Sequence, residues 1–184
     1  MTGTPEITVA TPADRERIVD SLVAAFPADP VLRFLFPDDT EYPRQAAAFF
    51  GRLFDKRVGK GSIWTIGGLS AAIWEPPTGG DEPAGELDVP ADALARVRSY
   101  EDALHSALPR EPFWYLGVLG THPSVAGRRW GRAVMAAGLR RAAEDGLPAV
   151  LETSKPANVD LYRRAGWTVV GEFTHPQQTW VMQQ

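Results

Sequence analysis

The sequence contains no cysteine. Disulfides, thiolate metal sites and a cysteine nucleophile are therefore excluded. No apolar run approaches the roughly 18 residues that a membrane-spanning helix requires. The first residues also lack the basic segment and apolar core of a signal peptide. No spacing of possible ligands calls for a metal, so we expect a cytoplasmic protein that needs neither a membrane nor a metal ion.

The chain also lacks an excess of positive charge. Its formal net charge is −4, which argues against non-specific binding of nucleic acid. The 184 residues, with 44% hydrophobic and 23% charged side chains, have the composition of a soluble globular protein. We find no internal repeat or low-complexity tract. One domain over residues 1–184 is the expected organisation.

The apolar periodicity, helix caps and chain breakers predict strands alternating with helices. Strands are expected at 7–10, 62–66, 69–74, 113–120, 148–153, 167–173 and 179–182. Helices are expected from a cap at Thr11 or Asp14 to about residue 25, and at 31–36, 43–57, 91–108, 130–145 and 157–165. This order predicts a mixed α/β fold in which helices pack on a central sheet. The Gly67-Gly68 pair predicts a tight hairpin between two of the strands.

Residues 75–90 form the one run that is typical of a loop, because they are rich in proline, glycine and acids. Its acidic residues are Glu75, Asp81, Glu82, Glu86 and Asp88. We favour a solvated surface loop. The alternative is a mobile acidic lip that attracts a cationic substrate. The apolar residues 34–36 are expected in the core, with the wall of a substrate pocket as the alternative.

The most informative stretch runs from Phe113 to Asp145. It reads as an apolar strand, a loop containing Gly127 and Gly131, and a helix. The first N–H groups of a helix have no partners inside the helix, and the helix dipole is positive at that end. A loop followed by a helix N-terminus is therefore suited to binding phosphate.

The charges on this helix are reversed from the usual preference. Arg128, Arg129 and Arg132 crowd its start, whereas Glu144 and Asp145 lie at its end. Each unfavourable placement costs on the order of 0.3–1 kcal/mol. A bound polyanion would turn that cost into binding energy. A solvated arginine cluster that tolerates the penalty is the alternative, and charge alone does not decide between the two.

The spacing excludes a P-loop and a G-x-G-x-x-G dinucleotide fingerprint. Residues 126–131 instead resemble motif A of the GCN5-related N-acetyltransferase (GNAT) superfamily, Gln/Arg-x-x-Gly-x-Gly/Ala. Gly131 matches the last glycine. Ala126 occupies the first position, and Arg129 stands where the family has its middle glycine.

Residues 151–173 resemble motif B of the same superfamily. Asn158, Tyr162, Gly166 and Trp167 occupy its asparagine, tyrosine and Gly-aromatic positions. The strand Leu-Glu-Thr-Ser is similar to that of the puromycin N-acetyltransferase-type branch. The resemblance implies a central mixed, mostly antiparallel sheet that splays between its fourth and fifth strands. It also implies direct transfer of an acetyl group from acetyl-CoA to an amine.

The resemblance implies that Tyr162 is the general acid. A tyrosine with a pKa of about 10 stays protonated at neutral pH and can donate to a departing thiolate, whose pKa resembles the value of about 8.5 for cysteine. Asn158 lies four residues earlier, so both side chains project from one face of the helix. The alternative for Tyr162 is a core tyrosine with a satisfied hydroxyl.

Glu152 is the expected general base, acting directly or through water. It is a charged residue within an otherwise apolar strand, and a carboxylate there must be partnered or functional. A structural hydrogen bond to a neighbouring strand or loop is the alternative. His122, which follows the preceding strand, is a second candidate for the base.

The resemblance assigns the remaining site residues to acetyl-CoA. Backbone groups at the edge of the fourth strand would bind the pantetheine, helped by the amide of Asn158. The glycines would let the backbone approach the phosphates, and the arginines would pair with them. The full expected set is Leu119, Thr121, Gly127, Arg128, Arg129, Trp130, Gly131, Arg132 and Asn158.

The expected acceptor is the amine of a small antibiotic- or metabolite-like molecule, acted on by a monomer or homodimer. The aromatic residues of the first half suggest a closed pocket; they are Phe26, Phe34, Phe36, Phe49 and Phe50. One alternative is a degenerate module that binds acyl-CoA or a protein without catalysis, because Ala126 and Arg129 depart from the motif. The other is an enzyme that acetylates peptides or proteins.

Overall fold

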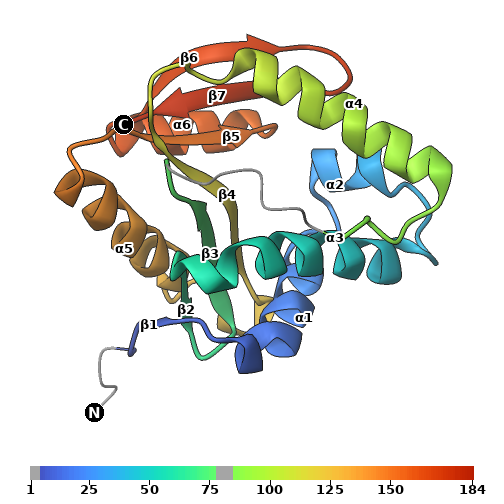
Figure 1. The fold of residues 1–184 in the computed structure, drawn as a ribbon, viewed down its shortest axis with the longest axis horizontal. Helices are drawn as coiled ribbons and strands as arrows, with labels where there is room; N and C mark the ends of the chain where they lie inside the picture. Colours follow the sequence, from blue (N-terminus) through green and yellow to red (C-terminus); the bar gives the residue numbers. More distant parts are fainter. Residues whose placement is uncertain (1–4, 78–84) are drawn as a thin grey trace.

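The computed structural model describes residues 5–77 and 85–184. Seven strands form one sheet in the order β1-β2-β3-β4-β5-β7-β6 (Figure 1). The strands are β1 Thr8–Val9, β2 Ile63–Ile66, β3 Ser70–Glu75, β4 Trp114–Thr121, β5 Ala149–Thr153, β6 Thr168–Phe173 and β7 Thr179–Gln183. β4 and β5 pair in parallel, and the other neighbouring strands pair antiparallel.

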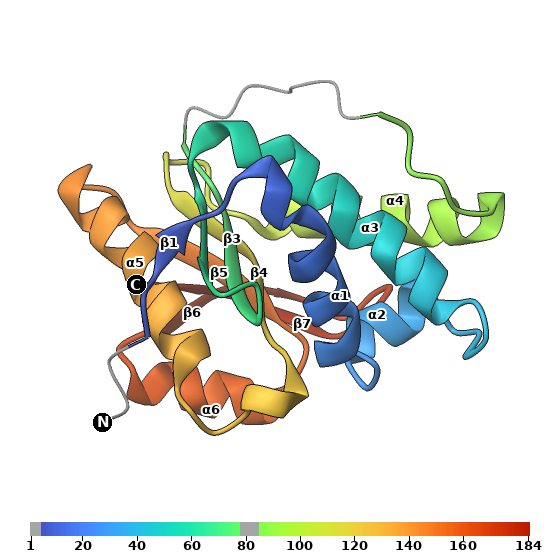
Figure 2. The same ribbon diagram turned by 90° about the horizontal axis from the view of Figure 1, so that it is seen from below.

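Helices cover both faces of this sheet. They are α1 Arg15–Ala25, α2 Pro30–Leu35, α3 Tyr42–Arg57, α4 Ala91–Ala107, α5 Trp130–Glu144 and α6 Pro156–Arg164. α1 and α3 pack on one face of β3 and β4, whereas α5 packs on the opposite face (Figure 2). α6 packs against β5 and β6, and α4 contacts β6 and α2. The mixed, mostly antiparallel sheet that the sequence predicted is confirmed.

Each face of the sheet has its own hydrophobic core. On the side of α1 and α3, Leu22, Phe50 and Phe54 are buried. On the side of α5 and α6, the indoles of Trp74 and Trp167 are buried. Residues 34–36 belong to the first core, where Leu35 and Phe36 are fully buried and Phe34 packs against it. Their predicted place in the core is therefore confirmed.

The hairpin between β2 and β3 turns at Gly67 and Gly68, as predicted. Their φ angles are 57° and 72°. The Leu69 N–H donates to the Ile66 carbonyl at 3.0 Å, and positive φ at both central residues is the pattern of a type I′ turn, which glycine adopts without a steric penalty. Because Ile66 pairs with Ser70, Leu69 is an additional residue between the turn and β3.

β3 then pairs with β4 as far as Glu75, which lies opposite Tyr115. Placing Glu75 in a loop was therefore wrong, because the strand continues one residue further.

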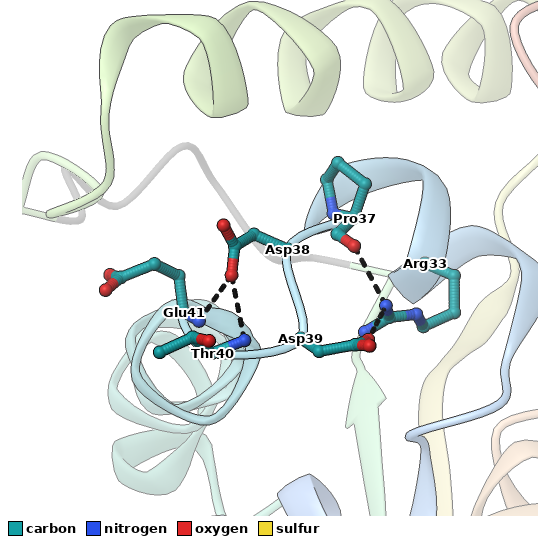
Figure 3. Close-up of polar contacts among 6 residues, drawn as sticks. All are labelled: Arg33, Pro37, Asp38, Asp39, Thr40 and Glu41. Carbon is teal, nitrogen blue, oxygen red and sulfur yellow. Dashed lines mark hydrogen bonds and ion pairs between the residues drawn. The ribbon is translucent and has the colours of Figure 1, made fainter.

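A short corner joins α2 to α3 (Figure 3). The Asp38 carboxylate accepts hydrogen bonds from the backbone N–H groups of residues 40–41, at 2.8 and 3.1 Å. Such bonds from an aspartate to the backbone two and three residues further on form a local turn, here directly before the first residue of α3. The Arg33 guanidinium donates to the Pro37 carbonyl at 2.9 Å and to the Asp39 carboxylate. These contacts fix the start of α3 beside α2, and both helices contribute to the cavity described below.

The sheet opens between β4 and β5. Their pairing begins at Trp114 and Ala149 and ends at Leu116 and Leu151. β4 continues to Thr121 without pairing with β5. Against β3, the register shifts after Leu116, which makes Gly117 the extra residue of a β-bulge. The predicted splay between the fourth and fifth strands is confirmed, and the bulge marks where it begins.

Candidate active site

A cavity of about 520 Å³ lies at this opening of the sheet. Residues 116–119 of β4, residues 151–153 of β5 and the following Ser154 line it on one side, together with α6. Side chains of α2, α3 and α4 line the other side. One cavity thus connects the gap between the strands to a pocket under the helices.

Glu152 projects into this cavity from β5. Burial raises the pKa of its carboxyl group to about 7, and the nearby Asp29 adds to the effect. The Tyr115 hydroxyl donates a hydrogen bond to the Glu152 carboxylate, which acts in the opposite direction. A carboxyl group with a pKa near neutrality can exchange protons at neutral pH, as a general base must.

Tyr115 is a site residue that the sequence reasoning missed. It lies on β4, in register with Val150, so that its hydroxyl reaches Glu152 from the neighbouring strand. Burial, and then the charge of Glu152, raise the pKa of Tyr115 well above its ordinary value. It therefore remains a hydrogen-bond donor. The available signal was a tyrosine within an apolar strand that pairs with the strand carrying a lone acid.

Tyr162 and Asn158 both line the cavity from α6, as their spacing predicted. The Asn158 amide donates to the Thr153 hydroxyl at 3.2 Å. The Tyr162 ring packs edge-to-face on Trp167, with ring centroids 5.8 Å apart. Burial, and then the charge of Glu152, raise the pKa of Tyr162. The phenol therefore stays protonated at neutral pH and faces the same space as Glu152.

The loop before α5 presents unpaired backbone donors. The first N–H of α5 to find a helical acceptor is that of Ala133, which donates to the Arg129 carbonyl at 3.1 Å. In the described part of the chain, the N–H groups of residues 129–132 have no protein acceptor. Gly127 has φ 80° and Arg129 has φ 61°, the left-handed conformation that glycine favours. Arg129 thus adopts a backbone conformation that glycine would adopt without strain.

The arginines at the start of α5 point to solvent rather than into the cavity. Arg128, Arg129 and Arg132 are exposed. The Arg128 guanidinium lies 5.5 Å from the centre of the Trp130 ring. An exposed arginine cluster beside unpaired N–H groups is a site that favours anions.

The acidic end of α5 has its own partners. The Asp145 carboxylate accepts a hydrogen bond from the Trp114 indole at 2.8 Å. Arg141 pairs with Asp145 at 3.3 Å and with Glu144 at 3.5 Å. Local contacts therefore offset the unfavourable charges at this end of α5. The exposed arginines at the start of the helix remain available to bind an anion.

The loop packs closely on the end of β4. A Cβ atom at Gly131 would lie 3.1 Å from the Thr121 hydroxyl. The backbone N–H of His122 donates to the carbonyl of Leu69, the residue before β3, at 2.7 Å. Hydrogen-bonded residues alternate along an antiparallel strand. Leu119 and Thr121 accordingly turn their backbone groups away from β3, toward the gap.

Two other expectations can be placed. His122 lies outside the cavity, where its Nδ1 accepts from the Ser124 N–H at 3.1 Å. Phe26, Phe49 and Phe50 line the cavity, whereas Phe34 and Phe36 do not. The aromatic wall is therefore made by α3 and the end of α1.

The acidic lip is not supported at its first residue. The Glu75 carboxylate is partly buried and pairs with Arg57 at 2.6 Å and with Lys60 at 2.5 Å. Asp81 and Glu82 lie outside the described residues. Glu86 and Asp88 are exposed and do not line the cavity.

Within residues 5–77 and 85–184, no group of three or more His, Asp or Glu side chains could hold a metal ion. None of the helices in that part of the chain is long and apolar enough to cross a membrane.

Residues 25–167 match the family model described as the acetyltransferase (GNAT) family. A crystal structure described as histone acetyltransferase HPA2 and related acetyltransferase, from Corynebacterium glutamicum, is similar, with a TM-score of 0.68 and 23% sequence identity. The alignment covers 98% of this chain and 95% of that chain.

Two insect enzymes share the fold at lower identity. Arylalkylamine N-acetyltransferase 2 from Aedes aegypti has a TM-score of 0.69 and 10% identity, with 99% of both chains covered. The polyamine N-acetyltransferase of Drosophila melanogaster, described as forming N-acetylagmatine, has a TM-score of 0.57 and 13% identity, with 98% of both chains covered. At these identities the likeness establishes the shared fold alone.

Proposed function

This chain belongs to the acetyltransferase (GNAT) family, and from that premise we propose that it is an acetyl-CoA-dependent N-acetyltransferase acting on a small amine. One observation carries the proposal. The cavity at the β4–β5 gap contains a carboxyl group with a pKa of about 7, a half-buried tyrosine and an aromatic wall. Acetyl transfer to an amine needs a base, an acid and a place for the acceptor, and one cavity supplies all three.

The described residues fit the cosubstrate. Acetyl-CoA would supply the acetyl thioester. The backbone of Leu119 and Thr121 faces the gap and would hold the pantetheine, together with Asn158. The unpaired N–H groups of residues 129–132 would bind the pyrophosphate. The exposed arginines at the start of α5 would add charge-assisted hydrogen bonds.

Glu152 would act as the base. An alkyl amine has a pKa of about 10.4 and must lose a proton before it can attack. This first proton goes to solvent. The neutral amine nitrogen then forms a bond to the acetyl carbon while the bond from that carbon to sulfur breaks. The nitrogen must give up a second proton to become an amide nitrogen, and we assign that proton to Glu152, directly or through water. The hydrogen bond from Tyr115 to one oxygen of Glu152 leaves the other oxygen for the acceptor.

Tyr162 would act as the acid that returns a proton to the departing sulfur. Its raised pKa keeps the hydroxyl protonated at neutral pH. Its position on the same helix face as Asn158 places it beside the expected path of the pantetheine. Glu152 ends the step protonated and Tyr162 ends it ionised, so solvent must restore both groups.

The acceptor is proposed to be a small amine with an apolar or aromatic body. Phe26, Phe49 and Phe50 line the cavity that contains Glu152. Two structural neighbours are described as enzymes of arylalkylamines and polyamines, which supports a small amine, whereas the apolar or aromatic body is inferred from the lining of the cavity alone. We also propose a relationship to the puromycin N-acetyltransferase-type branch, on the strand Leu151–Ser154.

A direct comparison of acceptors tests this proposal. The protein is incubated with acetyl-CoA and either a panel of arylalkylamines and amine drugs or a peptide library, and products are identified by mass spectrometry. We expect acetylation of members of the amine panel. Peptide turnover without any small-amine product would replace the proposal with a peptide acetyltransferase.

A further inference from the structure

A second chemical feature of the cavity narrows the class of acceptor. The inference drawn from it rests on the proposed function. The end of α3 and the 3-10 turn Val58–Lys60 form a cationic wall that lies in the cavity and away from the loop before α5. Lys56, Arg57 and Lys60 line the cavity there. We propose that this wall binds a carboxylate of the acceptor, so that the substrate is an amine with a carboxylate at its opposite end.

The wall has more positive than negative charge. Arg57 and Lys60 share a single carboxylate, that of Glu75. Lys56 forms no ion pair with any described residue. Glu101, on α4, also lines this part of the cavity. Three cations therefore face only two acids, Glu75 and Glu101, so the wall carries a net positive charge.

The surroundings of Lys56 support the same conclusion. Burial lowers the pKa of Lys56, and the neighbouring guanidinium groups of Arg52 and Arg57 lower it further. These effects outweigh the opposing influence of Glu101 and Glu75. The Nε atom of Arg52 is itself buried without a hydrogen-bond partner among the described residues. An anion placed here would reduce the repulsion between these cations.

The other two acids that line the cavity are Glu152 and Asp29. They interact with each other, and Glu152 is the proposed base for the reacting amine. Aromatic side chains line the same cavity, including Phe49, Phe113 and Tyr100. His105 lines it from α4. An acceptor with an amine, an aromatic body and a terminal carboxylate matches these features in charge and polarity.

Two acceptors of equal size but different charge test the inference. The first is para-(aminoethyl)benzoate, and the second is para-(aminoethyl)benzamide, in which a neutral amide replaces the carboxylate. We expect the wild-type protein to use the carboxylate with a kcat/KM about 10-fold higher, which corresponds to about 1.4 kcal/mol. Equal or better use of the amide overturns the inference.

Variants assign the preference to the cationic wall. Lys56→Met keeps most of the side-chain length and should abolish the preference for the carboxylate, whereas Lys56→Arg should retain it. Arg44→Met is the matched control, because Arg44 lies on the same helix but pairs with Glu41 at the exposed surface, at 3.1 Å. A preference that survives in Lys56→Met contradicts the assignment.

Binding measurements separate this inference from the proposed function. Calorimetric titration of both compounds, with CoA present, should show about 10-fold tighter binding of the carboxylate in the wild-type protein. If other amines are acetylated but the carboxylate binds no tighter than the amide, the inference fails and the proposed function stands. If no amine is acetylated, the proposed function fails, and the two affinities still decide the inference.

Discussion

Replacing Tyr115 by phenylalanine should move the pH dependence of the reaction to higher pH. The Tyr115 hydroxyl donates to the Glu152 carboxylate and therefore stabilises its ionised form. A hydrogen bond to a charged group is worth about 1.5–3 kcal/mol, and about 1.4 kcal/mol corresponds to one pKa unit. At the lower limit, Tyr115→Phe should raise the pKa of Glu152 by about 1.

The assay is the pH profile of kcat/KM for one amine acceptor. Both Glu152 and the amine must be deprotonated for reaction. Below the pKa of the amine, about 10.4, the logarithm of the rate should fall by about 1 per pH unit. Below the pKa of Glu152, which is about 7, it should fall by about 2 per pH unit. Tyr115→Phe should move only the lower break, to higher pH.

A matched control loses a tyrosine hydroxyl elsewhere. Tyr42 donates to the Val23 carbonyl at 3.3 Å and does not line the cavity, so Tyr42→Phe should leave the break in place. Glu152→Gln should remove the break. The reasoning is refuted if Tyr115→Phe keeps the wild-type profile, or if the lower break persists in Glu152→Gln.

Three further changes have expected outcomes. Tyr162→Phe should lower kcat by about 100-fold or more while the calorimetric Kd for acetyl-CoA stays unchanged; an equal loss of binding would make the residue structural. Gly131→Asp should weaken acetyl-CoA binding about 10-fold more than the neutral, equally large Gly131→Asn, and equal losses would remove the anion site from this loop. Arg129→Gly should raise the free energy of unfolding in urea by about 1 kcal/mol, because φ is 61°, and should weaken acetyl-CoA binding; unchanged stability would show that Arg129 carries no strain.

Features set by local sequence could be predicted. The hairpin at Gly67 and Gly68 could be predicted because the turn requires positive φ, which glycine adopts without a steric penalty. The pairing of Asn158 with Tyr162 on one face of α6 follows from the helical period. Glu152 was predicted to be functional because a lone carboxylate in an apolar strand must have a partner or a role. Each of these inferences uses residues only a few positions apart.

Features set by long-range register could not be predicted in this way. Tyr115 reaches Glu152 because β4 and β5 are parallel neighbours, yet 37 positions separate the two residues. Glu75 was misplaced in a loop because its strand is extended by pairing with β4, and its partners Arg57 and Lys60 belong to α3 and to the 3-10 turn that follows it. The cationic wall could not be predicted either, because it depends on how the end of α3 packs beside β3. The single-domain organisation, cytoplasmic location and oligomeric state stay predictions.

The central claim is that the cavity transfers an acetyl group to an amine. The most direct measurement is the rate of CoA thiol release with and without an added arylalkylamine, with the product identified by mass spectrometry. We predict release that depends on the amine, an N-acetylated product, and loss of both in Glu152→Gln. Binding of acetyl-CoA without any acetylated amine would contradict the claim and would indicate an acyl-CoA-binding module on this fold.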